Sequence, residues 1–242
     1  MEKNLTSAST QVNAKNIIII IVLVLVVFGV IYNSKKSKVA EPVVTDIPNI
    51  IVPSTLPVND QEKARQEIKS LNEKISSNTC IETGERSCYD EHLQLGIKYE
   101  SLGQLSDAIA SYRKASAISP KDYVPYSNIG SAYYGIKKFA EAEIAFLKAI
   151  DITPNNVSVY TKLYDLYFHG LKRLPHEMNA FFTDAMKNTN NDINIVKLYA
   201  LYLEEINDLE SALPIWESLL NLEPNNAAYK AKVGALQKKI KH

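Results

Sequence analysis

Two cysteines are the residues of this sequence whose chemistry is most informative. Cys80 and Cys88 are separated by seven residues, a spacing that fits neither a zinc knuckle nor a C-x-x-C redox pair. The alternatives are two free thiols or one disulfide that closes a short loop, and we favour the disulfide. Disulfides persist outside the reducing cytoplasm, so this pairing places the segment in an oxidising compartment.

The four histidines do not outline a catalytic or metal site. None of His92, His169, His176 and His242 stands at metal-ligand spacing from another, and no acid–base pair or nucleophile motif accompanies them. The sequence also has no phosphate-binding glycine loop and no G-x-S-x-G motif. We therefore expect no enzymatic activity, no metal and no cofactor.

The overall charge is balanced, with 27 Lys and Arg residues against 27 Asp and Glu residues. Binding to nucleic acid phosphates requires a basic surplus, so we expect no nucleic acid partner. Ala, Leu, Lys, Glu and Ile are abundant and Gly is scarce, which favours a helical protein.

An apolar run near the N-terminus predicts a membrane-spanning helix. Residues 17–32 contain no charge and a single glycine, Gly29, and lysines flank them on both sides. A bilayer core needs about 20 helical residues, and the flanking polar residues make up the difference. A cleaved signal peptide is the main alternative, but no suitable cleavage site follows. We predict an N-terminal tail over 1–15 and an uncleaved helix over 16–34 that contacts membrane lipid.

The lysines do not decide the orientation of this single-pass anchor. Lys3, Lys15 and the terminal amine balance Lys35, Lys36 and Lys38 under the positive-inside rule. The predicted disulfide then favours an extracytoplasmic location for the rest of the chain.

Two short segments follow the predicted anchor. Residues 35–59 contain four prolines, which forbid a helix and favour an extended spacer. Asp60 is a candidate N-cap for a helix over 60–78, in which Ala64, Ile68, Leu71 and Ile75 form one apolar stripe. The stripe either dimerises the protein as a coiled coil or packs on the next domain. It is too short for an isolated coiled coil, so we favour packing and a monomer or weak homo-oligomer.

The remaining sequence repeats itself with an offset of 34 residues. Six positions recur with matched residue types: Gly96, Tyr99, Ala108, Tyr112, Ala115 and Pro120 return as Gly130, Tyr133, Ala142, Phe146, Ala149 and Pro154. This pattern resembles the tetratricopeptide repeat (TPR), a 34-residue pair of helices whose signature residues stand at these positions.

The resemblance implies an all-α helical-hairpin solenoid over residues 89–242. Its four repeats cover 89–122, 123–156, 157–192 and 193–226, and a capping helix covers 227–241. The third repeat is degenerate because Tyr164 replaces a small residue at position 8, two residues are added to its turn, and Asn190 replaces the closing proline. In a linear repeat array such defects lower local stability.

The resemblance also implies a groove, lined by the first helix of each repeat, that binds an extended or helical peptide. The candidate residues are Leu93, Ile97, Glu100, Val124, Ser127, Asn128, Ser131, Tyr134, Thr161, Asp165, Phe168, Lys197, Leu201 and Glu204. Chaperone C-terminal tails are disfavoured as ligands. The family's carboxylate clamp needs Lys and Asn where this chain has Leu93 and Ile97, although Asn128 matches one clamp position.

These features together predict a membrane-anchored module that binds a protein or peptide partner. We expect it to be a scaffold or assembly factor for a membrane or envelope complex. The alternative is a non-catalytic accessory subunit of a membrane enzyme or of a secretion or pilus machine.

Overall fold

The computed structural model of the protein describes residues 50–77 and 88–241. The predicted membrane helix, most of the proline-containing spacer and Cys80 lie outside the described residues. Within the described residues, no helix is both long enough and apolar enough to span a bilayer. Their secondary structure is helical apart from one isolated bridge between Ile51 and Gln104, which confirms the predicted all-α class.

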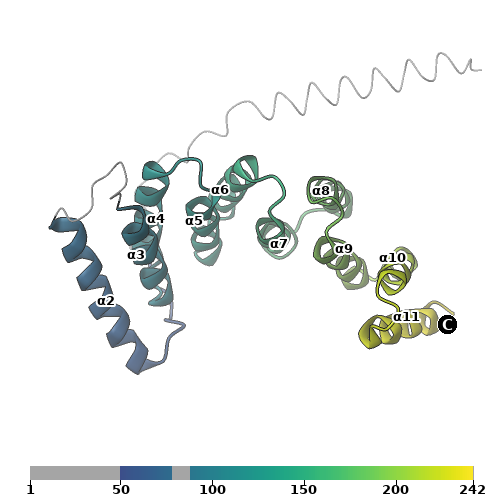
Figure 1. Ribbon diagram of the computed structural model, residues 1–242. Helices are drawn as coiled ribbons and strands as arrows, with labels where there is room; N and C mark the ends of the chain where they lie inside the picture. Colours follow the sequence, from purple (N-terminus) through teal and green to yellow (C-terminus); the bar gives the residue numbers. More distant parts are fainter. Residues whose placement is uncertain (1–49, 78–87, 242) are drawn as a thin grey trace, which may run out of the picture. The chain divides into compact units, whose positions relative to one another are not determined.

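The helices follow one another in consecutive pairs (Figure 1). A single helix, α2, precedes the first pair, and a single helix, α11, follows the last. The bounds in chain order are α2 Val58–Ser76, α3 Tyr89–Ser101, α4 Leu105–Ile118, α5 Tyr123–Gly135, α6 Phe139–Ile152, α7 Val157–Asp165, the π-helical turn η1 Leu166–Gly170, α8 Pro175–Asn188, α9 Ile193–Glu205, α10 Leu209–Leu222 and α11 Ala227–Ile240.

An Asp or Asn side chain begins the first helix of each later pair. Asp122 accepts a hydrogen bond of 2.9 Å from the backbone N–H of Val124, and Asn156 accepts one of 3.1 Å from that of Val159. Such caps satisfy backbone donors that have no partner inside the helix. Asp192 and Asn226 cap α9 and α11 in the same way. The caps therefore fix the start of each new helical pair.

Glycine allows the two helices of the first and second pairs to approach closely. A Cβ atom on Gly96 would lie 2.3 Å from Cε1 of Tyr112, and one on Gly130 would lie 2.6 Å from Cδ1 of Phe146. Tyr112 and Phe146 are almost completely buried. The recurring glycine and aromatic positions of the sequence are thus direct packing partners.

The third pair is built differently because Tyr164 occupies the position of these glycines. Its ring centroid lies 5.8 Å from that of Phe182 and 5.6 Å from that of Phe168. This bulk keeps α7 and α8 further apart than the helices of the other pairs. The two extra residues of the sequence are accommodated here, where α7 continues into the π-helical turn η1.

The apolar core is divided at α7. Val159 and Leu163 of α7 and Leu166 of η1 pack with α4, α5 and α6, whereas Tyr160 and Tyr164 of α7 pack with α8, α9, α10 and α11. The described repeats therefore have two cores that meet at the degenerate third repeat.

The end of the predicted spacer is attached to the first pair. The backbone N–H of Val52 donates to the carbonyl oxygen of Gly103 at 2.9 Å, and that of Thr55 donates to Ser101 at 3.2 Å. Gly103 has φ 76°, and a Cβ there would lie 1.9 Å from the Val52 oxygen. Residues 50–57 therefore lie outside any helix and are held to the turn between α3 and α4 by backbone hydrogen bonds, an attachment that the sequence did not predict.

Helix α2 begins at Val58, before the predicted cap at Asp60. Pro57 precedes the helix, and Asp60 lies in its first turn, where a negative charge is stabilised by the helix dipole. Ala64 and Leu71 are buried and α2 packs against α3. Within the described residues, the apolar stripe thus covers the first repeat, as we favoured over the coiled coil.

Candidate protein-binding face

We call the predicted groove positions of α3, α5, α7 and α9 the binding face. Ile97 and Leu201, which occupy position 9 of the first and fourth repeats, are 47% and 41% exposed. Thr161 is also exposed, and Ser127 is buried. The partly buried members are Leu93, Glu100, Val124, Asn128, Ser131, Tyr134, Asp165, Phe168, Lys197 and Glu204. All these side chains except that of Ser127 are therefore accessible in part.

A lysine that the sequence analysis did not select joins α5 and α7. The ammonium group of Lys162 donates to Oγ of Ser127 at 3.0 Å. Burial lowers the pKa of Lys162, and the charge of Glu100 acts in the opposite direction. Lys162 of α7 is therefore hydrogen-bonded to α5 and attracted to the Glu100 carboxylate of α3. The only sign of this role in the sequence was that Lys162 directly follows the candidate residue Thr161.

Two glutamates of the binding face also hold aromatic side chains of the second helices. The Tyr112 hydroxyl donates to Oε2 of Glu100 at 2.7 Å, and Nε1 of Trp216 donates to Oε1 of Glu204 at 2.8 Å. Lys232 of α11 forms an ion pair of 3.1 Å with Glu204. These carboxylates therefore have structural partners on the side that faces the core.

A second group of carboxylates lies where α7 meets α9. The Tyr164 hydroxyl donates to Oε2 of Glu205 at 3.3 Å. Burial raises the pKa of Tyr164 well above its usual value, and the negative charges of Glu205 and Asp165 add to this effect. Burial also raises the pKa of Asp165, while the nearby His169 opposes the increase. This part of the face is acidic.

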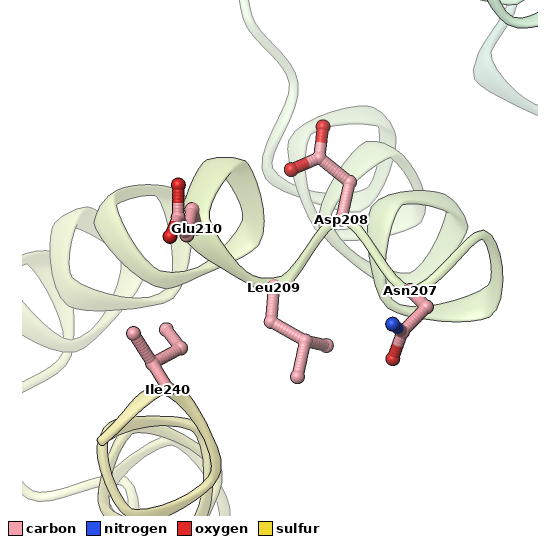
Figure 2. Close-up of a pocket in the computed structure, with 5 residues that line it drawn as sticks. All are labelled: Asn207, Asp208, Leu209, Glu210 and Ile240. Atoms are coloured by element: carbon pink, nitrogen blue, oxygen red, sulfur yellow. The ribbon is translucent and has the colours of Figure 1, made fainter. Parts of the chain in front are cut away.

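The described pockets lie away from the binding face. One, of about 360 Å³, is lined by Asn207, Asp208, Leu209, Glu210 and Ile240, where the start of α10 meets the end of α11 (Figure 2). The other, of about 300 Å³, lies between α2 and α3. Both are small and mix charged with apolar groups. No cluster of metal-binding side chains occurs in the part of the chain that the structure describes.

The described residues include one of the two cysteines of the predicted disulfide. Cys88 is disulfide-bonded and 4% exposed at the start of α3. Cys80, the other cysteine of the sequence, lies outside the described residues. The pairing of Cys80 with Cys88 stays a prediction.

Paired helices with a close glycine–aromatic contact define a helical-hairpin repeat protein. A family model described as TPR repeat matches residues 96–137, and one described as tetratricopeptide repeat matches residues 125–156. The chain thus contains tetratricopeptide repeats, as the sequence predicted. Such repeats are typically non-catalytic modules for protein–protein interaction.

Solved structures with the same fold support this assignment. The crystal structure of MamA is 18% identical, with a TM-score of 0.52 over 72% of this chain and 99% of that chain. A tetratricopeptide repeat protein from Parabacteroides merdae ATCC 43184 is 15% identical, with a TM-score of 0.55 over 74% of this chain and 67% of that chain. No curated protein matches the sequence. At these identities the similarity concerns the fold alone.

Proposed function

We propose that this chain is a membrane-anchored interaction module whose binding face holds a segment of a partner protein. The observation that carries the proposal is the exposure of Ile97 and Leu201, 47% and 41%, at the same position of two first helices. Exposed apolar side chains on the first and fourth repeats of such a face can anchor a bound segment at its two ends. The module serves as a scaffold or assembly factor for a membrane or envelope complex.

The anchor of this module is the apolar segment 16–34, and its repeats lie on the extracytoplasmic side. The apolar run and its flanking lysines support the anchor. The disulfide bond of Cys88 supports the orientation, since disulfides persist in oxidising compartments. A membrane-impermeant maleimide should label intact cells only after reduction. Labelling that needs lysis but no reductant would place free thiols in the cytoplasm and overturn the orientation.

Site-specific photo-crosslinking in native membranes tests the binding face. A photoreactive amino acid at Ile97 or Leu201 should capture the same partner, which mass spectrometry identifies. Leu222 provides the control, because it is a 72% exposed leucine on the second helix α10. Equal capture from all three positions, or capture from Leu222 alone, would show that the binding face is not the site.

A further inference from the structure

Helix α5 contributes no charged side chain of its own to the binding face. It contains no Asp, Glu, Lys or Arg, unlike α3, α7 and α9. Its accessible side chains at the binding face are Val124, Asn128, Ser131 and Tyr134. A cation lies against it, because the ammonium group of Lys162 donates to Ser127. A basic side chain that crosses α5 would therefore lose hydration without gaining an anionic partner from this helix.

Carboxylates predominate over lysines on the helices that lie on both sides of α5 in the chain, α3 before it and α7 and α9 after it. At the groove positions α3 supplies Glu100, α7 supplies Asp165 and α9 supplies Glu204. The same helices carry two more carboxylates, Asp90 at the start of α3 and Glu205 directly after Glu204. The cations there are Lys197, at a groove position, and Lys162, directly beside one. The face is therefore acidic, although the whole chain is neutral.

These carboxylates differ in whether a lysine already pairs with them. Glu204 is paired with Lys232, and Glu100 attracts Lys162. In contrast, none of the ion pairs among the described residues involves Asp90, Asp165 or Glu205. Near Asp165 and Glu205, the Tyr164 hydroxyl donates one hydrogen bond, at 3.3 Å to Glu205.

We propose that the segment held by the binding face is basic: it carries Lys or Arg residues on both sides of a short uncharged stretch. The inference rests on the proposed function of this face. The uncharged stretch crosses α5 and covers Ile97 at one side, while the basic side chains lie near Asp90 and near Asp165 and Glu205. An acidic segment would instead bring like charges together, which disfavours binding.

Selection from a displayed library of random 12-residue peptides tests this inference with the full-length chain in detergent micelles. The enriched peptides should be basic, with Lys or Arg residues on both sides of a short uncharged stretch. Replacing Asp165→Asn and Glu205→Gln together should weaken an enriched peptide by about two- to fivefold per carboxylate, and added salt should weaken it further. Asp184→Asn, on the exposed side of α8, is the matched control and should change nothing.

A second selection against the double variant Ile97→Gln and Leu201→Gln, which removes the apolar anchors without changing the charge, separates the two proposals. If enrichment is lost in this variant but the selected peptides are neutral or acidic, the face binds and the basic partner class is wrong. If the same peptides are enriched by both proteins, the face is not the site and both proposals fail. Acidic peptides that depend on the four lysines of α11 would likewise overturn the basic class.

Discussion

The Tyr112 hydroxyl donates a hydrogen bond of 2.7 Å to Glu100, which links the buried aromatic of the second helix to the binding face. Trp216 and Glu204 reproduce this relationship in the fourth repeat. In the second and third repeats the equivalent aromatics are Phe146 and Phe182, which have no polar hydrogen, and aromatic residues replace the glutamates. The binding face therefore carries a glutamate in the two repeats whose buried aromatic residue, Tyr112 or Trp216, needs a hydrogen-bond acceptor.

Removing the Tyr112 hydroxyl should destabilise the repeats. Tyr112→Phe deletes a hydrogen bond to a charged group, and we expect the free energy of unfolding to fall by about 1–2 kcal/mol. Urea unfolding followed by circular dichroism measures it. Tyr123→Phe is the control, because no hydrogen bond of the Tyr123 hydroxyl is described, and it should change stability by less than about 0.5 kcal/mol. Equal losses in both variants would contradict a specific role for the Tyr112–Glu100 bond.

Two glycines at the same repeat position should respond oppositely to alanine. Gly130→Ala places a methyl group against the ring of Phe146, whereas a Cβ on Gly234 of α11 meets nothing within 4 Å. We expect Gly130→Ala to lower the free energy of unfolding by about 1–3 kcal/mol. Gly234→Ala should raise it by about 0.5–1 kcal/mol, since alanine favours a helix. Urea unfolding of both variants decides this, and a stabilised Gly130→Ala would disprove the packing argument.

The repeat sequence predicted which positions pack but not every contact. Gly96 and Tyr112 recur at fixed offsets because each hairpin solves the same packing problem, but the sequence did not predict that they contact each other. The attachment of Val52 to Gly103 could not, since it rests on backbone groups that carry no side-chain signature. The sequence located the insertion of the third repeat, but a count of extra residues does not reveal a π-helical turn. Lys162 was missed because only the fold brings it to Ser127.

Alkaline pH should destabilise the protein. Burial raises the pKa of the Tyr112, Tyr164 and Tyr167 hydroxyls far above their ordinary value. In the unfolded chain tyrosine loses its proton near pH 10, while these folded tyrosines keep theirs, so their contribution is complete below pH 10 and is lost as the pH rises above it. Above pH 10, each of these tyrosines lowers the free energy of unfolding by at most about 1.4 kcal/mol per pH unit. Urea midpoints between pH 8 and 11 should fall above pH 10.

Phenylalanine variants provide the control for this pH dependence. Tyr164→Phe removes one titrating group, so its stability should decline less steeply above pH 10 than that of the unmodified protein. A stability that stays constant to pH 11 would contradict the prediction.

The third repeat should open most readily among the described helical pairs. Tyr164 separates α7 from α8, and the two apolar cores meet here rather than continuing through. Arg173 bridges the region, with Nη2 3.1 Å from Glu143 of α6 and Nη1 3.1 Å from Glu177 of α8. Because residues 171–174 lie outside any helix and none of residues 171–176 is buried, amide hydrogen exchange should be fastest around residues 170–176.

Arg173→Gln should accelerate this exchange further, because it removes both ion pairs while leaving the cores intact. Exchange in α5, which packs in the first core, should stay unchanged. Lys187→Gln removes an exposed charge from the last turn of α8 and serves as the control, with no effect expected on residues 170–176. Uniform protection across all four pairs, or equal acceleration in α5, would show that the third repeat is no weaker than its neighbours.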